Sequence, residues 1–302
     1  MVESQSVPPR NNRPTACEGN DELLSIRLGR FICTSGFSQA EAQAAIRAHR
    51  NCLAGGAGTI LKNDTHTKVT LVFLPAGRCV CVKEYCWRGV WWCLKDLLRR
   101  PPARREWDAA QRLFSAGVSI ARYFALVERA AFWTRDSAFL ISEALEAVVP
   151  LNQFLTRAFP SPHDMAQRER KMMFLRAVAD FLGGLHNRGI CHRDMKSSNI
   201  LIRELGKHWT FVLVDLADVR FLSPGRTAGR RHRLRNLAEL NSSTPLVIGR
   251  TDRLRFLLHY ARHVSCLQPI RRTWAEVIRR TSRRRCIWEQ DADPPCEGAT
   301  AG

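Results

Sequence analysis

The stretch GICHRDMKSSNILI, residues 189–202, sets a group of polar residues between two apolar segments. Within it the tripeptide His192–Asp194 is followed, after four further residues, by Asn199. In phosphoryl-transfer enzymes this spacing provides an Asp that accepts the proton of the acceptor hydroxyl and an Asn that holds a metal ion. Asp194 is therefore the candidate base, Asn199 a candidate metal ligand, and Lys196 a candidate contact of the transferred phosphate.

The sequence on both sides of this stretch strengthens the interpretation. Between residues 166 and 188, apolar residues including Phe174, Val178 and Leu182 recur at helical spacing, which predicts one long amphipathic helix that ends before Gly189. The later run FVLVDLADV (211–219) places Asp215 at the end of an apolar strand. A carboxylate at that position binds magnesium in phosphoryl-transfer enzymes, so Asp215 is the second candidate metal ligand.

The N-terminal half supplies a candidate phosphate-binding lysine. VTLVFL (69–74), PAGR (75–78) and CVCVKEY (79–85) predict a β-hairpin with Lys83 in the middle of its second strand. A lysine among apolar neighbours needs an anionic partner. The predicted helix 103–117, whose stripe includes Trp107 and Phe114, offers Glu106. Glu84 and Asp96 are competitors, although Glu84 belongs to the opposite strand face from Lys83.

Two parts of such a nucleotide site are less distinct in the sequence. A glycine-rich loop is expected one hairpin before Lys83, but the sequence there is NDTHTK (63–68), and the glycine cluster GGAG (55–58) comes too early. Thr65 and Thr67 are candidate phosphate contacts, and an ordinary turn remains equally open. Between the strand-like SAFLIS (137–142) and LNQFL (151–155), Glu143 and Leu145 are the candidate hinge residues whose backbone pairs with adenine.

Composition bounds the class of protein. The 302 residues include 47 Lys and Arg against 28 Asp and Glu, a net charge of +19, which favours an anionic partner. No zinc-finger, RNP or helix-turn-helix pattern is found, so we expect no specific nucleic acid. The 11 cysteines form no CxxC pair. No run reaches the length of a signal-peptide core or a membrane span, which predicts a cytoplasmic protein.

With these residues assembled, the chain resembles the protein-kinase-like superfamily through GLHNRGICHRDMKSSNILI and FVLVDL. The stretches VCVKEY, ARREWDAAQRL, RRHRLRNLAELNSSTP and RTDRLRFLLHYAR are similar to the bacterial lipopolysaccharide core kinases, the Kdo and heptose kinases. The resemblance implies an α+β, two-lobed fold. We expect an N-lobe with a small antiparallel sheet and one helix over 22–145, a mostly helical C-lobe over 146–285, and unpacked tails at 1–21 and 286–302.

The resemblance further implies ATP-dependent transfer of the γ-phosphate to a sugar hydroxyl of the lipopolysaccharide inner core, with ATP and Mg²⁺ as cofactors. The expected partner is the lipopolysaccharide core or another anionic acceptor, reached at the cytoplasmic face of the inner membrane through peripheral contact. A protein Ser/Thr kinase or another small-molecule kinase is the alternative, although no A-P-E motif follows Asp215. A nucleotide binder without catalysis is disfavoured because none of the key residues is lost.

Basic and aromatic residues outside this set are candidates for acceptor or membrane contact. The run RFLSPGRTAGRRHRLRN (220–236) concentrates arginines, and guanidinium groups bind phosphate bidentately. The candidates are Arg230, Arg231 and Arg233, with Arg226 and Arg235 nearby; a solvated basic loop is the alternative. Asn236 stands where the related pattern commonly has Asp. Three tryptophans in YCWRGVWWCLKDLLRR (85–100), at 87, 91 and 92, fit lipid headgroups or ordinary packing.

Overall fold

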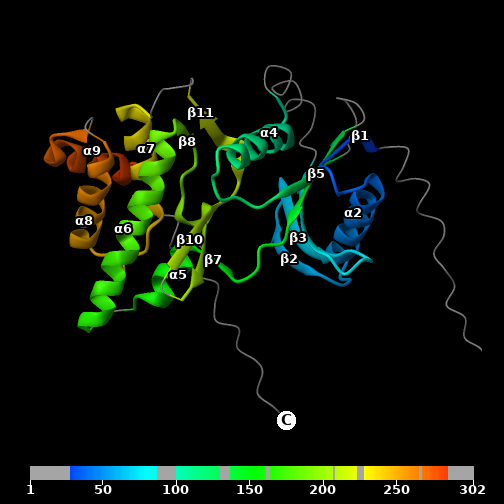
Figure 1. Ribbon diagram of the computed structural model, residues 1–302, viewed down its shortest axis with the longest axis horizontal. Helices are drawn as coiled ribbons and strands as arrows, with labels where there is room; N and C mark the ends of the chain where they lie inside the picture. Colours follow the sequence, from blue (N-terminus) through cyan, green and yellow to red (C-terminus); the bar gives the residue numbers. More distant parts are fainter. Residues whose placement is uncertain are drawn as a thin grey trace, which may run out of the picture.

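The structure, a computed structural model, describes residues 28–86, 100–129, 137–160, 164–206, 208–222, 228–264 and 267–284. Its N-terminal part is an antiparallel sheet with one helix on each side, and its C-terminal part is mostly helical (Figure 1). These two parts are called the N-lobe and the C-lobe below. The predicted α+β, two-lobed arrangement is confirmed, whereas the predicted tails, residues 1–21 and 286–302, lie outside the described residues.

The N-lobe sheet has the strand order β1-β5-β6-β4-β3-β2, and every neighbouring pair is antiparallel. Its strands are β1 (Leu28–Cys33), β2 (Thr59–Asn63), β3 (Thr67–Phe73), β4 (Cys79–Tyr85), β5 (Tyr123–Arg129) and β6 (Ala138–Glu143). The predicted hairpin is β3–β4, and Gly77, with φ of 79°, permits its tight turn. Alternation along β4 buries Val80 and Val82 on one face and places Lys83 on the other.

Helix α2 (Gln39–Leu53) covers the sheet face that carries Val80 and Val82. A capping box begins it: the Ser38 side chain accepts from the Glu41 N–H, and the Glu41 carboxylate accepts from the Ser38 N–H. The glycine cluster 55–58 joins α2 to β2 and lies outside the turn before β3. A Cβ at Gly58 would meet the Leu71 carbonyl oxygen at 2.8 Å, so this glycine serves close packing.

Helix α4 (Pro102–Ser115) lies on the opposite face of the sheet and carries Glu106. The predicted helix is confirmed, but one member of its predicted stripe is wrong. Phe114 is 62% exposed, and the adjacent Leu113 is the buried residue. Trp107 packs against Leu126 and Leu140 of the sheet, so α4 is anchored about two turns away from Phe114.

The C-lobe is built from five α-helices among the described residues, together with a three-stranded sheet, β10-β9-β7, and a two-stranded sheet, β11-β8. The helices are α5 (Leu151–Ala158), α6 (Met165–Asn187), α7 (Arg230–Ser243), α8 (Arg250–Tyr260) and α9 (Ile270–Ser282). The strands are β7 (Val148–Pro150), β8 (Ile190–His192), β9 (Ile200–Leu205), β10 (His208–Leu213) and β11 (Val219–Phe221). The predicted long helix is α6, and its stripe of Phe174, Val178 and Leu182 is fully buried.

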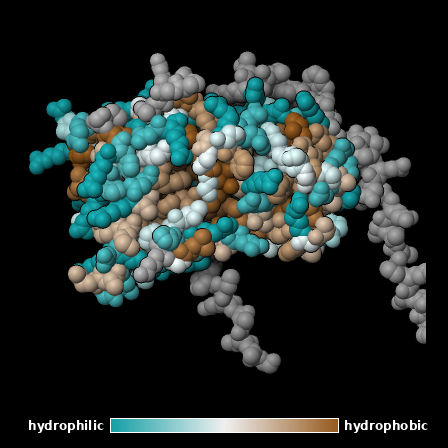
Figure 2. All heavy atoms as spheres, viewed as in Figure 1, coloured by the Kyte–Doolittle hydropathy of each residue, from teal (hydrophilic) through white to brown (hydrophobic). Residues whose placement is uncertain are grey.

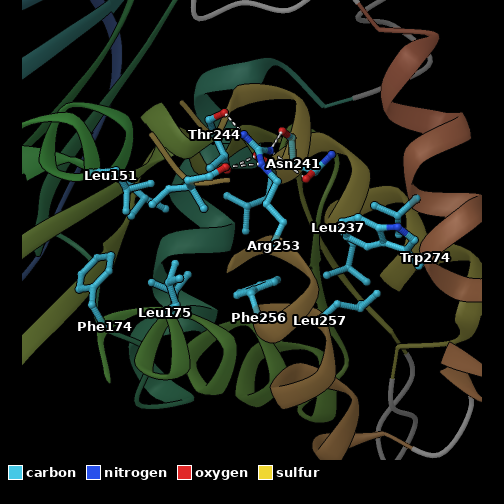
Figure 3. A pocket seen from close by; sticks show the side chains of 15 residues that line it. Leu151, Phe174, Leu175, Leu237, Asn241, Thr244, Arg253, Phe256, Leu257 and Trp274 are labelled. Carbon is cyan, nitrogen blue, oxygen red and sulfur yellow. Dashed lines mark hydrogen bonds between the residues drawn. The ribbon is translucent and has the colours of Figure 1, made fainter. Parts of the chain in front are cut away.

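A cavity of about 50 Å³ lies inside the C-lobe, between α5, α6, α7, α8 and α9 (Figure 3). Its walls are mainly apolar, and Arg253 on α8 points its guanidinium at the end of α7, where it donates to the carbonyl oxygens of Asn241 and Thr244. None of the candidate catalytic residues lines this cavity. In the described part of the chain, no helix is both long enough and apolar enough to cross a membrane.

Two adjacent glycines on α6 give a matched pair for testing its packing. A Cβ at Gly183 would lie 2.7 Å from the Cγ of His263, whereas a Cβ at Gly184 would meet nothing within 4 Å. The His263 ring is fixed because its Nε2 is 2.7 Å from the carboxylate of Asp180, which lies on α6 with the two glycines. Both glycines are inside a helix, where Ala is otherwise preferred by about 1 kcal/mol.

We therefore expect Gly183→Ala to lower the free energy of unfolding by at least about 1 kcal/mol, because the clash outweighs the gain in helix propensity. Gly184→Ala should leave the free energy of unfolding unchanged or raise it. Urea denaturation, monitored by circular dichroism, measures the free energy of unfolding of both variants. Equal stability of the two variants would contradict the packing described here.

Candidate active site

Lys83 joins the two lobes. Its Nζ lies 2.8 Å from Glu106 Oε2 on α4 and 2.8 Å from Asp215 Oδ1, which follows β10 of the C-lobe. Burial by itself would lower the pKa of Lys83, but the two carboxylates raise it well above its usual value. The structure thus brings together three residues that are far apart in the sequence and that the sequence assigned to one nucleotide site.

The Glu106 carboxylate is 2% exposed and accepts three hydrogen bonds. Besides Lys83, the hydroxyl groups of Tyr85 and Tyr123 donate to its two oxygens, Tyr123 at 2.6 Å. Burial, followed by the charge of Glu106, raises the pKa of both tyrosines well above the usual value. Both hydroxyls therefore stay protonated donors, and they orient the carboxylate toward Lys83.

The catalytic loop follows β8 and begins with the predicted base. Lys196 Nζ lies 3.0 Å from Asp194 Oδ2, and the Asn199 amide Nδ2 donates to the Asp194 carbonyl oxygen at 2.9 Å. Both side chains of the pair Asp194 and Lys196 are about one-third exposed, so solvent reaches them. The loop is thus folded so that the candidate base, the candidate phosphate contact and the candidate metal ligand lie within one turn.

His192 connects this loop to Asp215. Its Nδ1 accepts from the Asp194 N–H at 3.0 Å, and its Nε2 lies 3.0 Å from the Asp215 carbonyl oxygen, which requires the proton on Nε2. Asp215 has φ of 57°, a left-handed conformation that is uncommon for a non-glycine residue. The pKa of Asp215 is lowered: burial opposes this, but Lys83 and His192 outweigh it. The side chain is therefore held as a carboxylate.

The predicted hinge lies where β6 ends. Glu143 is the last residue of β6, and its N–H donates to the Arg122 carbonyl oxygen at 2.8 Å. Leu145 is in the short link between β6 and β7. This link also contains Ala147, whose φ is 51°. The structure places both residues at the connection between the lobes, and adenine pairing by their backbone stays a prediction.

Comparison with known proteins agrees with this geometry. The model of the lipopolysaccharide kinase (Kdo/WaaP) family matches residues 63–260. The chain belongs to this family. The matched span includes every candidate catalytic, nucleotide and metal residue discussed above. The predicted phosphotransferase of the lipopolysaccharide core kinase family is thus confirmed, and this class of enzyme uses ATP.

Individual relatives support the same assignment. The kinase is 31% identical to the lipopolysaccharide core heptose(I) kinase WaaP of Pseudomonas aeruginosa over 190 residues, which are 58% of this chain and 67% of the relative. It is 30% identical to the 3-deoxy-D-manno-octulosonic acid kinase of Mannheimia succiniciproducens over 139 residues. That match spans 46% of this chain and about half (51%) of the relative's length.

A solved structure supports the fold. WaaP in complex with acyl carrier protein superimposes with a TM-score of 0.58 at 24% identity, covering 84% of this chain and 98% of that chain. The predicted protein-kinase-like fold is therefore confirmed.

The turn at the expected glycine-rich position is held by a carboxylate. Asp64 Oδ1 accepts from the backbone N–H groups of His66 at 2.8 Å and Thr67 at 2.6 Å. Although its partial burial acts in the opposite direction, these bonds and the ammonium of Lys62 lower the pKa of Asp64 to about 2. Thr67 is buried and Thr65 is exposed. Two N–H groups of this turn are thus bound within the turn itself.

The arginine-rich run divides into two environments. Arg233 is 2% exposed, and its guanidinium donates to Tyr260, Asn187 and the Ala228 carbonyl oxygen, so its predicted place on an acceptor surface is wrong. It holds the start of α7 against α6 and α8. Arg230 and Arg231, by contrast, line an open groove between α7 and α9, together with Arg272 and Arg280 of α9.

The remaining predicted contacts fall outside the described residues. These are the tryptophans at 87, 91 and 92, the competitor Asp96, and Arg226. The other competitor for Lys83, Glu84, lies on the α2 side of the sheet, where its Oε2 is 3.3 Å from His49 Nε2. Its exclusion as the partner of Lys83 is therefore confirmed.

The sequence did not reveal how α7 holds the catalytic loop. Asn236 Oδ1 accepts from the His192 N–H at 3.2 Å, and its Nδ2 donates to the His192 carbonyl oxygen and, at 3.2 Å, to Glu239. Glu239 also accepts from the Met195 N–H at 3.0 Å. The amide at 236 thus uses both a donor and an acceptor, which an aspartate cannot do.

We therefore expect Asn236→Asp to destabilise the kinase by about 2 kcal/mol or more at pH 7. One oxygen of the new carboxylate would keep the His192 N–H and His186 Nε2, which lies 2.9 Å from Asn236 Oδ1, as donors. The other oxygen would face Glu239 and the His192 carbonyl oxygen in place of the amide Nδ2. This repulsion raises the folded pKa above its unfolded value of about 3.9. The destabilisation should be small below pH 4 and grow as the pH rises. Urea titrations at several pH values measure it.

Asn187→Asp is the control, because this residue is exposed and its Oδ1 accepts from the Arg233 guanidinium at 3.0 Å. The substitution removes only a long hydrogen bond, 3.4 Å, from the Asn187 Nδ2 to the His263 carbonyl oxygen. This variant should keep nearly the stability of the wild type at pH 7. If Asn236→Asp were as stable as Asn187→Asp at that pH, the orientation of the Asn236 amide described here would be wrong.

Proposed function

We propose that this kinase transfers the γ-phosphoryl group of ATP to a sugar hydroxyl of the lipopolysaccharide inner core, and that the reaction depends on Mg²⁺. The observation that carries this proposal is the Lys83 ammonium, bound at 2.8 Å to one carboxylate from each lobe. The family membership supplies the substrate class. The reaction would take place at the cytoplasmic face of the inner membrane.

The residues divide the chemistry as follows. Asp194 accepts the proton of the acceptor hydroxyl. At the same time the hydroxyl oxygen forms a bond to the γ-phosphorus, and the bond between that phosphorus and the ADP oxygen breaks. Lys196, 3.0 Å from Asp194, lies next to the transferred group and offsets its negative charge. Lys83 binds the α- and β-phosphates, with Glu106 holding it in place.

Mg²⁺ fits the donor set of this site. Asp215 offers a carboxylate and Asn199 an amide oxygen, and such hard oxygen ligands together with phosphate oxygens are what Mg²⁺ prefers. When bound, the ion neutralises charge on the phosphates. Asp215 is held ready for this role because Lys83 and His192 fix its side chain and its carbonyl group.

The acceptor is anionic in this proposal, which a basic groove of the C-lobe supports. Hydrophilic residues gather over α8 and α9 in Figure 2. The groove between α7 and α9 contains four arginines, Arg230, Arg231, Arg272 and Arg280, and one acidic residue, Glu276. Outside this groove, Arg235 of α7 donates to the Arg193 carbonyl oxygen at 2.7 Å, so one basic residue of α7 reaches the catalytic loop. Phosphorylated sugars or anionic lipid headgroups suit such a surface.

The test of the activity is transfer of labelled γ-phosphate from Mg-ATP to dephosphorylated lipopolysaccharide. We expect the wild type to label lipopolysaccharide and Asp194→Ala to lose at least about a thousandfold in rate while binding ATP normally. Asp108→Ala, which removes a half-buried carboxylate of α4 that pairs with Arg100 and Arg104, is the control and should keep the activity. Label found only in a protein acceptor offered in parallel would favour a protein kinase instead.

The metal role has its own test. Chelation by EDTA should stop the transfer, and added Mg²⁺ should restore it. Asn199→Ala should raise the Mg²⁺ concentration needed for half-maximal rate at least about tenfold. An unchanged Mg²⁺ requirement in this variant would remove Asn199 from the metal site and leave the assignment of Asp194 standing.

A further inference from the structure

A second lysine lies on the same sheet face as Lys83. In the strand register Lys62 of β2 is opposite Val69 of β3, and Val69 is opposite Lys83 of β4. Residues directly opposite one another across an antiparallel sheet project to the same face. Two strand spacings separate the two lysines, which puts their Cα atoms roughly 10 Å apart.

A β-bulge produces this alignment. The pairing of β2 with β3 shifts between Ile60 and Lys62, so that Leu61 is the extra residue. Without the shift, Lys62 would be opposite Lys68 and would project to the face covered by α2. The bulge therefore turns the Lys62 side chain to the face where Lys83, Glu106 and Asp215 meet.

The turn after Lys62 holds the lysine there and lacks the usual means of binding phosphate. Asp64 Oδ2 lies 2.9 Å from Lys62 Nζ, while Asp64 Oδ1 accepts from the N–H groups of His66 and Thr67. A glycine-rich loop binds phosphate through such N–H groups. Two of them donate here to a carboxylate, so these two N–H groups do not donate to phosphate.

We propose that Lys62 is a second phosphate-binding residue of the nucleotide site, which replaces the glycine-rich loop by a positively charged side chain. This inference rests on the proposed use of ATP. The Lys62 side chain is 55% exposed, so its ammonium is free to move from Asp64 to an incoming phosphate group. Burial raises the pKa of Asp215, and the charges of Lys83, His192 and Lys62 lower it, so the field of Lys62 reaches this carboxylate.

Substitution of Lys62 tests the proposal through the affinity for different nucleosides and nucleotides. Lys62→Met should weaken binding of Mg-ATP at least about tenfold in isothermal titration calorimetry, because a charge-assisted hydrogen bond to phosphate is lost. Binding of adenosine, which has no phosphate, should not change. Lys62→Arg should restore most of the affinity for Mg-ATP.

Lys68→Met is the matched control. Lys68 lies on the neighbouring strand, opposite Asn63 and Glu84, and so on the other face of the sheet. The Lys68→Met variant should bind Mg-ATP and adenosine with the affinities of the wild type. Because Lys62 is on the surface, its variants should fold normally, which thermal unfolding checks.

The outcomes separate the two proposals. Wild-type affinity of Lys62→Met for Mg-ATP would overturn the role of Lys62 and leave the proposed kinase reaction intact. Equal weakening of ATP and adenosine binding would also overturn it, because the effect would then not come from phosphate. A wild-type chain that binds no nucleotide would overturn both the role of Lys62 and the proposed function.

Discussion

The partly buried ammonium of Lys83 constrains the rest of the structure. An ammonium group on an inner strand of a sheet is costly unless it is paired and hydrogen-bonded. Its pairing with Glu106 requires that α4 pack on the sheet, and its pairing with Asp215 requires that the C-lobe bring the end of β10 to the same point. The arrangement of the lobes (Figure 1) thus satisfies one electrostatic requirement that originates in β4.

The parts of the fold that the sequence predicted are those with local signals. The β3–β4 hairpin has a Pro-Gly turn between β-branched runs, and α6 has a long stripe at helical spacing. Phe114 was wrongly assigned to the buried face of α4. The adjacent Leu113 is also apolar, and the spacing of apolar residues did not show which of the two is buried. Arg233 was misplaced because its partners, including Tyr260, come from other helices.

Other features of the site depend on contacts that local patterns do not encode. Asn236 holds His192 across 44 residues of sequence, and Tyr85 and Tyr123 meet at Glu106 only after three elements have packed. The bulge at Leu61 depends on how β2 pairs with β3. Because all five residues of β2 are exposed, no apolar pattern in its sequence specifies that pairing. A surface lysine therefore gives no sign in the sequence that it shares a face with Lys83.

Glu239 connects catalysis to the basic surface. This carboxylate is 2% exposed, and it accepts from the Met195 N–H on one side and from the guanidinium groups of Arg235 and Arg284 on the other. Its burial is tolerable because each oxygen has charged or backbone donors. The backbone beside Asp194, the proposed base, and two arginines, one from α7 and one just after α9, are thus bound by one side chain, so α7 links the loop that follows β8 to basic residues of the C-lobe.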